Sequence, residues 1–322
     1  MIKTSPLAAA VAAALVLCGA AQAQTWPAKP IRLVVPAVAG SAVDVQARRV
    51  ATDLAEALGQ PIVIDNRPGA NSAIGAREVA RATPDGYTLL QGNINNSLND
   101  LLLGDACCKL NEALVPITRL FSSPLVMVVN PKVQASDLKG YIALAKAQPQ
   151  LLTFASGGPG AITQLLGEKV KLAAGINVRE IPYKSIGAEM PDLLAGHVDT
   201  AYLAPVVVEQ NIKAGKLHAL GVAGPQRVAI ISQVPTMAEA GLPGIEAAGW
   251  NGLFAPAGTP DAVIRRLQAE TAKVLATPAM KAEAAQKGSE IGGEKPEEYA
   301  AFIRAEIAKW GKVIKDSGIK LQ

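Results

Sequence analysis

Residues 31–69 read IRLVVPAVAGSAVDVQARRVATDLAEALGQPIVIDNRPG. The β-branched apolar run at residues 31–35 predicts a buried strand. After a short loop, apolar residues recur at helical spacing through residues 43–58, which predicts a helix with one buried face that ends at Gly59. A second strand is predicted at residues 61–65. The order of strand, loop, helix and strand indicates an α/β fold.

The same order continues along the chain. A helix is predicted at residues 73–81 and a strand at residues 87–91, with turns between them. Further on, residues 151–155 predict a strand, residues 156–160 form a glycine-rich loop, and residues 162–173 predict a helix. Two similar units therefore lie over a hundred residues apart. They favour an α/β architecture with largely parallel sheets.

Two changes of domain are predicted, one near residues 121–124 and one near Trp250. A C-terminal helical segment that returns to the first domain would make the chain cross twice, which is the connectivity that lets two lobes hinge. The predicted boundaries place lobe 1 at residues 24–124 and 247–322, and lobe 2 at residues 125–246.

The N-terminus has the features of a secretory signal peptide. Lys3 precedes an apolar run at residues 7–21, and Ala21-Gln22-Ala23 then predicts cleavage after Ala23, so that residues 1–23 are removed. The run is shorter than the roughly 20 residues of a membrane span. Cys18 follows Leu17 rather than a small residue, so no lipid anchor is expected. The mature protein is therefore expected to be exported from the cytoplasm.

Composition limits the classes of function. Removing 23 residues from 322 leaves 299, which suggests two domains. Hydrophobic residues make up 50% of the chain and aromatic residues only 4%, so the core is expected to be aliphatic. The 31 Lys and Arg residues against 27 Asp and Glu give a net charge of +4 without basic blocks. This distribution argues against a nucleic-acid partner.

Export would bring the adjacent pair Cys107 and Cys108 into an oxidising compartment. Three states are open to this pair: a strained vicinal disulfide, a bond between chains, or free thiols. In each of them we expect the pair to have no part in ligand binding.

Motifs typical of enzymes are missing from the sequence. His197 and His218 have no metal-ligand spacing, and there is neither a G-x-S-x-G elbow nor a P-loop. The run at residues 158–163 begins like a dinucleotide fingerprint but has Pro159 where the backbone would approach a pyrophosphate. We therefore expect no catalysis, no cofactor and no metal site.

Two loops have the properties of an anion site. One lies around Gly40 and Ser41 and the other at residues 156–163, and each is predicted to follow a strand and to precede a helix. Unpaired backbone N–H groups at a helix start, together with the helix dipole, attract an anion. Hydroxyl groups of Ser41, Ser156 and Thr163 would add donors. The alternative is that both loops are ordinary turns with helix caps.

Ten short stretches, in this order, carry a resemblance to a known family. They are WPAKPIRLVVP (26–36), NRPGA (66–70), IGA (74–76), PDGYTLL (84–90), PYK (182–184), DLLAGHVD (192–199), IKAGKL (212–217), VPT (234–236), EAGLPG (239–244) and APAGTP (255–260). The mature chain resembles, over essentially its whole length, the Bug family of periplasmic binding proteins, which are the receptors of tripartite tricarboxylate transporters.

The resemblance implies two Rossmann-like lobes of the periplasmic binding protein (flytrap) type with a cleft between them. It implies a monomer that closes on a small organic carboxylate and presents it to the membrane subunits of a transporter. It places ligand contacts on residues Ala39, Gly40, Ser41, Asp44, Gly92, Asn93, Ser156, Gly157, Gly158, Gly160, Thr163, Tyr183, Lys184 and Leu203.

Other interpretations of these residues stay open. Asp44 lies in the first turn of a helix, where an acid is stabilising without touching a ligand. Tyr183 and Lys184 would also fit the end of a strand. A periplasmic sensor and a cleft hydrolase are the alternative functions.

The chain departs from the family at positions that bear on the ligand. Ser41, Val43, Pro159 and Gln164 replace other residues common in the family, and Leu203 stands where an acid is common. These changes suggest a pocket that is less suited to a ligand with an amino group and more tolerant of an apolar or aromatic carboxylate, because a buried ammonium would lack its partner.

Overall fold

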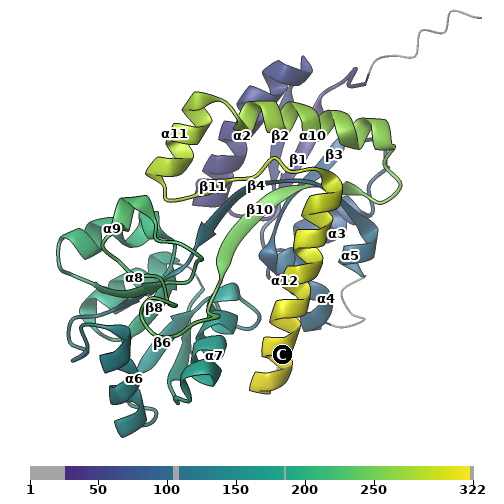
Figure 1. The fold of residues 1–322 in the computed structure, drawn as a ribbon. Helices are drawn as coiled ribbons and strands as arrows, with labels where there is room; N and C mark the ends of the chain where they lie inside the picture. Colours follow the sequence, from purple (N-terminus) through teal and green to yellow (C-terminus); the bar gives the residue numbers. More distant parts are fainter. Residues whose placement is uncertain (1–25, 104–108, 185, 320–322) are drawn as a thin grey trace, which may run out of the picture.

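The computed structural model describes residues 26–103, 109–184 and 186–319 (Figure 1). The expected leader with its cleavage after Ala23 lies outside these residues, as do Cys107 and Cys108, so what the sequence suggests for them stays a prediction. Within the described ranges, no helix is both long enough and apolar enough to cross a membrane.

The first of two sheets has six strands. Their bounds are β1 Ile31–Val35, β2 Ile62–Asn66, β3 Thr88–Asn93, β4 Leu114–Pro124, β10 Ala248–Pro256 and β11 Glu290–Ile291. Their spatial order is β11-β4-β10-β3-β1-β2. Strands from both ends of the chain therefore build one sheet.

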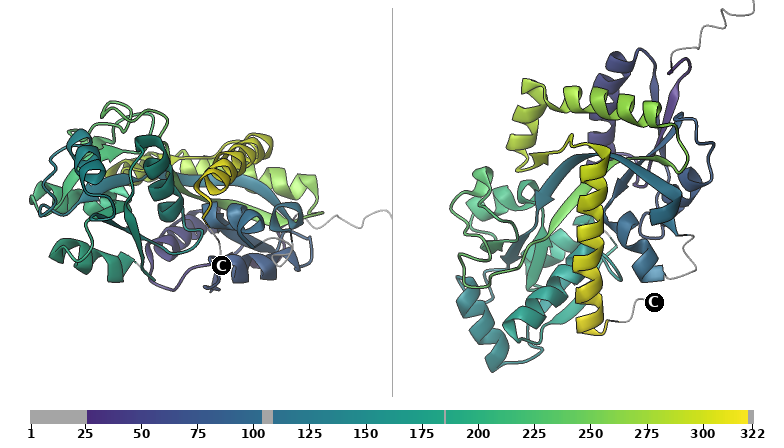
Figure 2. Two further views of the ribbon diagram at one scale, coloured as in Figure 1. Left: turned by 90° about the horizontal axis from the view of Figure 1, so that it is seen from below. Right: turned by 45° about the vertical axis from the view of Figure 1, so that its right-hand side comes forward.

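The second sheet has five strands from the middle of the chain. Their bounds are β5 Val126–Val129, β6 Thr153–Ser156, β7 Arg179–Pro182, β8 Thr200–Leu203 and β9 His218–Val222. Their spatial order is β7-β6-β8-β5-β9. Figure 2 shows the two sheets, each with its own helices, as two lobes lying side by side.

The expectation of largely parallel sheets is wrong. β1 pairs in parallel with β2 and β3, and β6 pairs in parallel with β7 and β8. β10 and β11, however, run antiparallel to their neighbours, and β5 runs antiparallel to β8 and β9. Both sheets are therefore mixed. β10 and β5, which begin where the chain enters their sheets from the other lobe, run opposite to the parallel strands.

Helices and one short 3-10 turn cover the sheets. The bounds are α2 Ala42–Leu58, α3 Ala73–Ala80, α4 Ile94–Leu103, α5 Leu110–Ala113, α6 Leu138–Ala147, α7 Ile162–Ala174, α8 Ile186–Ala195, α9 Pro205–Lys213, η2 Ala229–Ile231, α10 Asp261–Leu275, α11 Pro278–Gln286 and α12 Pro296–Ser317. The strands and helices predicted from the sequence up to residue 91 and at residues 151–173 are confirmed, with bounds that differ by at most two residues.

Local signals explain the bounds of α2. The Ser41 hydroxyl accepts a hydrogen bond from the Asp44 N–H, as a helix N-cap does. At the other end Gly59 has φ 70°, and its N–H donates to the carbonyls of Ala55 and Glu56. Glycine adopts this left-handed conformation without the steric cost that a side chain adds.

The chain passes twice between the sheets. β4 ends at Pro124 and β5 begins at Val126, while β10 begins at Ala248 after the chain returns. The two passages lie side by side, since the Leu125 N–H donates to the Ala247 carbonyl at 3.0 Å. This arrangement is the connectivity expected of two hinged lobes, and the exact boundaries at residues 124 and 247 stay a prediction.

The helix α12 links the two lobes. It packs against α4, beside the first sheet, and against α7, beside the second sheet (Figure 1). Its buried Trp310 and Val313 belong to the same apolar cluster as Leu165 and Val170 of α7. A second cluster joins β1, α2 and α10 on the opposite face of the first sheet. One continuous core therefore runs from one lobe into the other along α12.

Candidate functional site

The carboxyl ends of the parallel strands face the passage in both sheets. Asn93, the last residue of β3, lies opposite Asn251, near the start of β10 where the chain enters from the second sheet. Val126, the first residue of β5, lies opposite Leu203 and Val222, the last residues of β8 and β9. Since β1 and β2 run with β3, and β6 runs with β8, their carboxyl ends lie on the same side. Ligands of open α/β sheets bind at this end of the strands.

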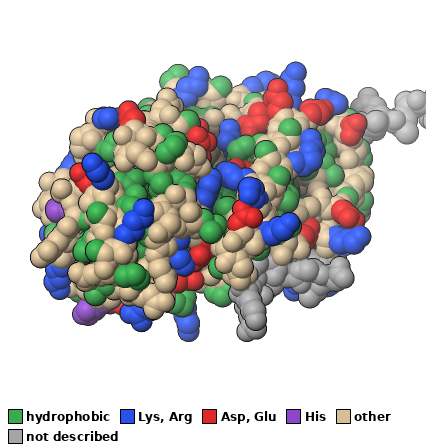
Figure 3. Space-filling view, turned by 60° about the horizontal axis from the view of Figure 1, so that its bottom comes forward, with side chains coloured by type: hydrophobic (Ala, Val, Ile, Leu, Met, Phe, Trp, Pro, Cys, Tyr) green, Lys and Arg blue, Asp and Glu red, His purple; other side chains and the backbone are tan. Residues whose placement is uncertain are grey.

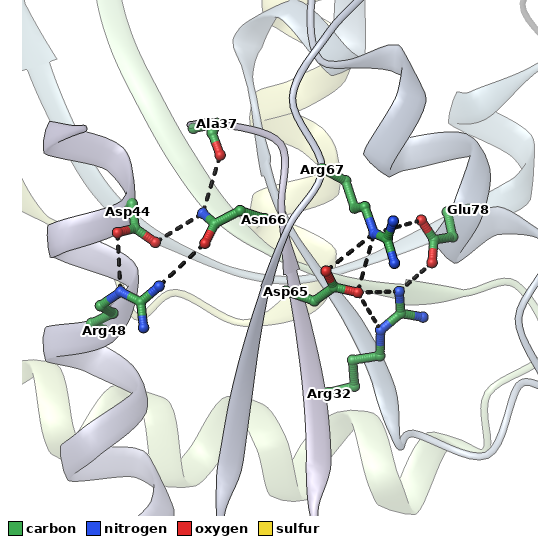
Figure 4. A network of polar contacts seen from close by, with 8 residues as sticks. All are labelled: Arg32, Ala37, Asp44, Arg48, Asp65, Asn66, Arg67 and Glu78. Atoms are coloured by element: carbon green, nitrogen blue, oxygen red, sulfur yellow. Dashed lines mark hydrogen bonds and ion pairs between the residues drawn. The ribbon is translucent and has the colours of Figure 1, made fainter. Parts of the chain in front are cut away.

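The loop between β1 and α2 is organised by Asp44. Its carboxylate accepts hydrogen bonds from Nε of Arg48 at 3.0 Å and from Nδ2 of Asn66 at 2.8 Å (Figure 4). It also accepts a hydrogen bond from the Gly40 N–H at 2.9 Å. The guanidinium of Arg48 is the main reason that the pKa of Asp44 is lowered to about 2. The side chain is only 2% exposed. In this conformation Asp44 therefore orders the loop through protein partners.

A second polar cluster lies on the other side of β2 (Figure 4). Arg32 of β1 pairs with Asp65 and with Glu78 of α3, and Nε of Arg67 lies 3.1 Å from an Asp65 oxygen. Burial alone would raise the pKa of Asp65, but the two guanidinium groups hold it below its usual range. The cluster fixes the end of β2 and with it the loop that leads to α3.

Free donors remain where α2 begins. The N–H groups of Ala42 and Val43 have no hydrogen-bond partner among the described residues, and neither group has a carbonyl within its own helix to bind. Ala39 and Gly40 are exposed and Ser41 is half-buried. The loop predicted from the sequence therefore does present backbone donors at the strand ends.

The loop before α3 was not identified from the sequence. Ala70, Asn71 and Ser72 all have positive φ, at 46°, 50° and 71°. Residues other than glycine rarely adopt a positive φ, and such backbone strain is concentrated at functional sites. Nδ2 of Asn93 donates to the Ser72 hydroxyl at 3.1 Å, so the predicted residue Asn93 supports this loop. The only sequence signal was Asn71, a residue type that tolerates positive φ.

Gly92 has a packing role in the structure. It is buried within β3, and a Cβ at this position would lie 2.6 Å from the Phe254 ring. The glycine thus lets Phe254 pack against the sheet.

In the second lobe the predicted glycine-rich loop satisfies most of its own donors. The Gly157 N–H donates to the Thr163 hydroxyl at 2.9 Å, and the Gly158 N–H donates to the Ser156 hydroxyl at 3.0 Å. The Gly160 N–H donates to Oε1 of Gln164 at 2.7 Å. Gly158 and Gly160 have φ of 86° and 77°, which accounts for glycine at both positions. The amides of these three glycines therefore hold the loop together.

Gln164 and Glu180 complete this loop, and the sequence did not assign Glu180 to the site. The Ser156 hydroxyl, which is fully buried, donates to Oε1 of Glu180. Nε2 of Gln164 donates to the other Glu180 oxygen at 3.0 Å. Both carboxylate oxygens are thus occupied by neutral donors. The pairing joins the start of α7 to β7 and has no signal in the local sequence.

The start of α7 offers free donors like those of α2. The N–H groups of Ile162, Thr163 and Gln164 have no partner among the described residues, and the first turn contains no acid. The Thr163 hydroxyl accepts from Gly157, so its own proton is available to a ligand. Helix starts at the ends of β1 and β6 therefore supply the same chemistry from both lobes.

The remaining predicted residues have other surroundings. The Tyr183 hydroxyl donates to Oδ2 of Asp192 at 2.8 Å, and burial together with this carboxylate raises the pKa of Tyr183 to about 12. Lys184 is exposed. The Leu203 side chain is 2% exposed and packs in the core of the second lobe. Of these three, only Lys184 has an exposed side chain, at the loop after β7.

A cavity of about 400 Å³ lies beside the passage between the lobes and contains none of the predicted site residues. Its lining includes Ser122 and Pro124 of β4, Ala247, and Phe302 of α12. It borders α12, the passage strands and the segment that follows β9, and neither helix start with free N–H groups lines it, so we do not assign the ligand to it.

Neither histidine belongs to a cluster of metal-ligand side chains in the part of the chain that the structure describes. Nδ1 of His197 lies 3.2 Å from Asp192, and His218 lies in β9. Among residues 26–103, 109–184 and 186–319, no three His, Cys, Asp or Glu side chains are grouped to hold a metal ion.

Comparisons with known proteins show the family to which this chain is similar. The model of the tripartite tricarboxylate transporter family receptor matches residues 46–319. Protein BugT of Bordetella pertussis is 36% identical over 305 residues, which cover 93% of each chain. The solved structure of R. palustris Rpa4515 with adipate has a TM-score of 0.83 and 31% identity, covering 92% of this chain and 99% of that chain. MatC (Rpa3494) from Rhodopseudomonas palustris with bound malate has a TM-score of 0.79 and 26% identity, covering 90% of this chain and 100% of that chain.

Proposed function

This chain belongs to the receptor family of tripartite tricarboxylate transporters, as its resemblance to Bug proteins suggested, and on that premise we propose that it binds a small organic carboxylate between its two lobes. The family is one of receptors, and two of the similar structures hold the carboxylates adipate and malate. The protein makes and breaks no bond in the ligand. It works as a receptor in the periplasm.

One observation carries the proposal. Helices α2 and α7 begin at strand ends that face the passage from opposite lobes, and both begin with N–H groups that have no partner among the described residues. A carboxylate between them would accept hydrogen bonds from both helices and would lie at the positive ends of both dipoles. Neither loop needs a lysine or an arginine for this role.

Lobe closure follows from the same arrangement. Donors on a single lobe are available in an open state, whereas donors on both lobes reach one ligand only in a closed state. A ligand that makes more contacts in the closed state shifts the population toward it. We propose residues 24–124 and 247–322 as lobe 1, residues 125–246 as lobe 2, and the paired passage at Leu125 and Ala247 as the hinge.

Delivery to a transporter is the role that we propose for the closed state. The family model describes a transporter receptor, so the expected partners are the membrane subunits of a tripartite tricarboxylate transporter, which would recognise a monomer with both lobes closed. A sensor would hand the same closed state to a signalling receptor. Co-purification with candidate membrane subunits, with and without ligand, separates the two roles.

Proline at the first helical residue tests the proposed donors without breaking a helix. Ala42→Pro and Ile162→Pro each remove one N–H, and proline is favourable at this position. The preceding residues Ser41 and Ala161 have ψ of 163° and 145°, which suits a following proline. The chain already has Pro205 at the start of α9. Both variants are therefore expected to fold.

Binding is measured by calorimetry with a panel of di- and tricarboxylates, aliphatic acids and aromatic acids. Each variant is expected to lower the affinity for the acid that binds best by about tenfold or more, because a hydrogen bond to a charged group is worth roughly 1.5–3 kcal/mol. Asp261→Pro is the control, since α10 begins beyond the far end of β10, away from the passage. Unchanged affinity in Ala42→Pro and Ile162→Pro would remove the helix starts from the site.

A further inference from the structure

The strand ends that face the passage carry exposed aliphatic side chains. Val38 follows β1 and is 61% exposed, and Val45 lies in the first turn of α2 at 52%. Ile74, in the first turn of α3, is 47% exposed, and Val206, in the first turn of α9, is 46% exposed. Four of the nine large aliphatic side chains that are exposed among the described residues thus lie at this one edge.

These positions lie on or beside helix starts at the same strand ends as the free donors. Val45 lies three residues after Ala42 and two residues after Val43, in the same first turn of α2. Ile74 begins the helix that follows β2, and Val206 begins the helix that follows β8, both at the same side of their sheets. A group held by the N–H donors would therefore have aliphatic surface beside it on both lobes.

The acid in the first turns of α2, α3, α7 and α9 is Asp44, and it is already engaged by protein donors. Asp44 is occupied by Gly40, Arg48 and Asn66. The first turns of α3, α7 and α9 contain no acid.

Two acids of the second lobe complete this picture. Glu180 is occupied by Ser156 and Gln164. Glu189, in the first turn of α8, is 4% exposed, and its burial raises the pKa of its carboxyl to about 7, which disfavours the charged form that an ammonium would need. A buried ammonium without a partner is unfavourable.

We propose that the ligand is a carboxylate with an apolar body and without an amino group. The backbone donors hold its carboxylate, and Val38, Val45, Ile74 and Val206 cover its hydrocarbon part when the lobes close. This inference rests on the proposed function, and it gives a structural basis to the ligand preference suggested by the sequence.

Matched ligand pairs test the inference by calorimetry on the mature protein. The pairs are 3-phenylpropanoate with phenylalanine and butanedioate with aspartate, in which the second member adds only an ammonium group. We expect the first member of each pair to bind at least tenfold more tightly. In the series from butanoate to hexanoate, each buried methylene is expected to tighten binding by up to about fourfold.

A double variant separates the aliphatic surface from the donors. The double variant Val45→Thr with Ile74→Thr is expected to lower the affinity for 3-phenylpropanoate about tenfold. Its affinity for butanedioate is expected to stay within about twofold of the wild-type value. Val63→Thr is the control, because Val63 is 56% exposed but lies near the amino end of β2.

Each outcome decides between the claims. Equal affinity for both members of the pairs, or an equal loss for both acids in the double variant, overturns the inference and leaves the carboxylate receptor in place. If no carboxylate of any kind binds, the proposed function falls and the inference falls with it.

Discussion

Asp44→Asn is expected to lower the free energy of unfolding by about 2 kcal/mol at pH 7. The carboxylate is 2% exposed and accepts three hydrogen bonds that order the loop before α2. Its pKa falls from 3.8 to about 2 on folding, and each pKa unit corresponds to about 1.4 kcal/mol. Asparagine offers a single acceptor oxygen and turns an NH₂ group toward donors, so it cannot replace the carboxylate.

The sign of the pH dependence follows from a lowered folded-state pKa. The contribution of Asp44 is fully present above pH 3.8 and is lost as the pH falls from 3.8 through about 2. Urea unfolding followed by circular dichroism at pH 7 and pH 3 measures it. The difference between wild type and Asp44→Asn should shrink by about half at pH 3.

The chain offers a matched control on the same helix. Asp53 pairs with Arg49 at the same i,i+4 spacing, but its side chain is 27% exposed. Asp53→Asn is expected to cost under about 1 kcal/mol, as surface ion pairs do. An Asp44→Asn loss that is the same at both pH values, or no larger than that of Asp53→Asn, would refute the reasoning.

Three further changes have defined outcomes. Glu189→Gln should match wild type in stability near pH 4.5 and exceed it by about 3 kcal/mol at pH 8. The pKa of Glu189 is about 7 in the folded state and 4.5 in the unfolded state, so wild type loses stability as the pH rises between these values. A difference in urea unfolding that does not change with pH contradicts this. Gly92→Ala should lower the melting temperature measured by calorimetry, because its Cβ would lie 2.6 Å from Phe254, and an unchanged value would show that the ring moves freely. Gln164→Leu removes one donor to the Glu180 carboxylate and is expected to cost about 2 kcal/mol in urea unfolding and to weaken ligand binding; full affinity would show that the loop does not need this support.

Local patterns were sufficient for most of the elements. The helix at residues 42–58 has its N-cap at Ser41 and its stop at Gly59, and both signals lie within the helix's own sequence. The strands β4 and β10 were not predicted, because β4 contains prolines and β10 contains glycines, and their pairing partners lie over a hundred residues away. The sheets were therefore expected to be more parallel than they are.

For the candidate site, the sequence located the loops but not all of their hydrogen-bond partners. The sequence located both loops at helix starts, and free N–H groups are present there. It did not reveal that Asn66 and Glu180, which arrive from other strands, bind Asp44 and Ser156. Residue types at one loop do not specify partners that only the tertiary fold brings near.

The central claim is that a carboxylate closes the two lobes. Small-angle X-ray scattering of the mature protein tests it most directly, with the acid that binds best by calorimetry and with the primary amide of that acid. We predict that the radius of gyration decreases at saturating acid and stays unchanged with the amide, which lacks the charge that the starts of α2 and α7 attract. An unchanged radius with calorimetrically bound acid, or an equal decrease with the amide, would contradict the account.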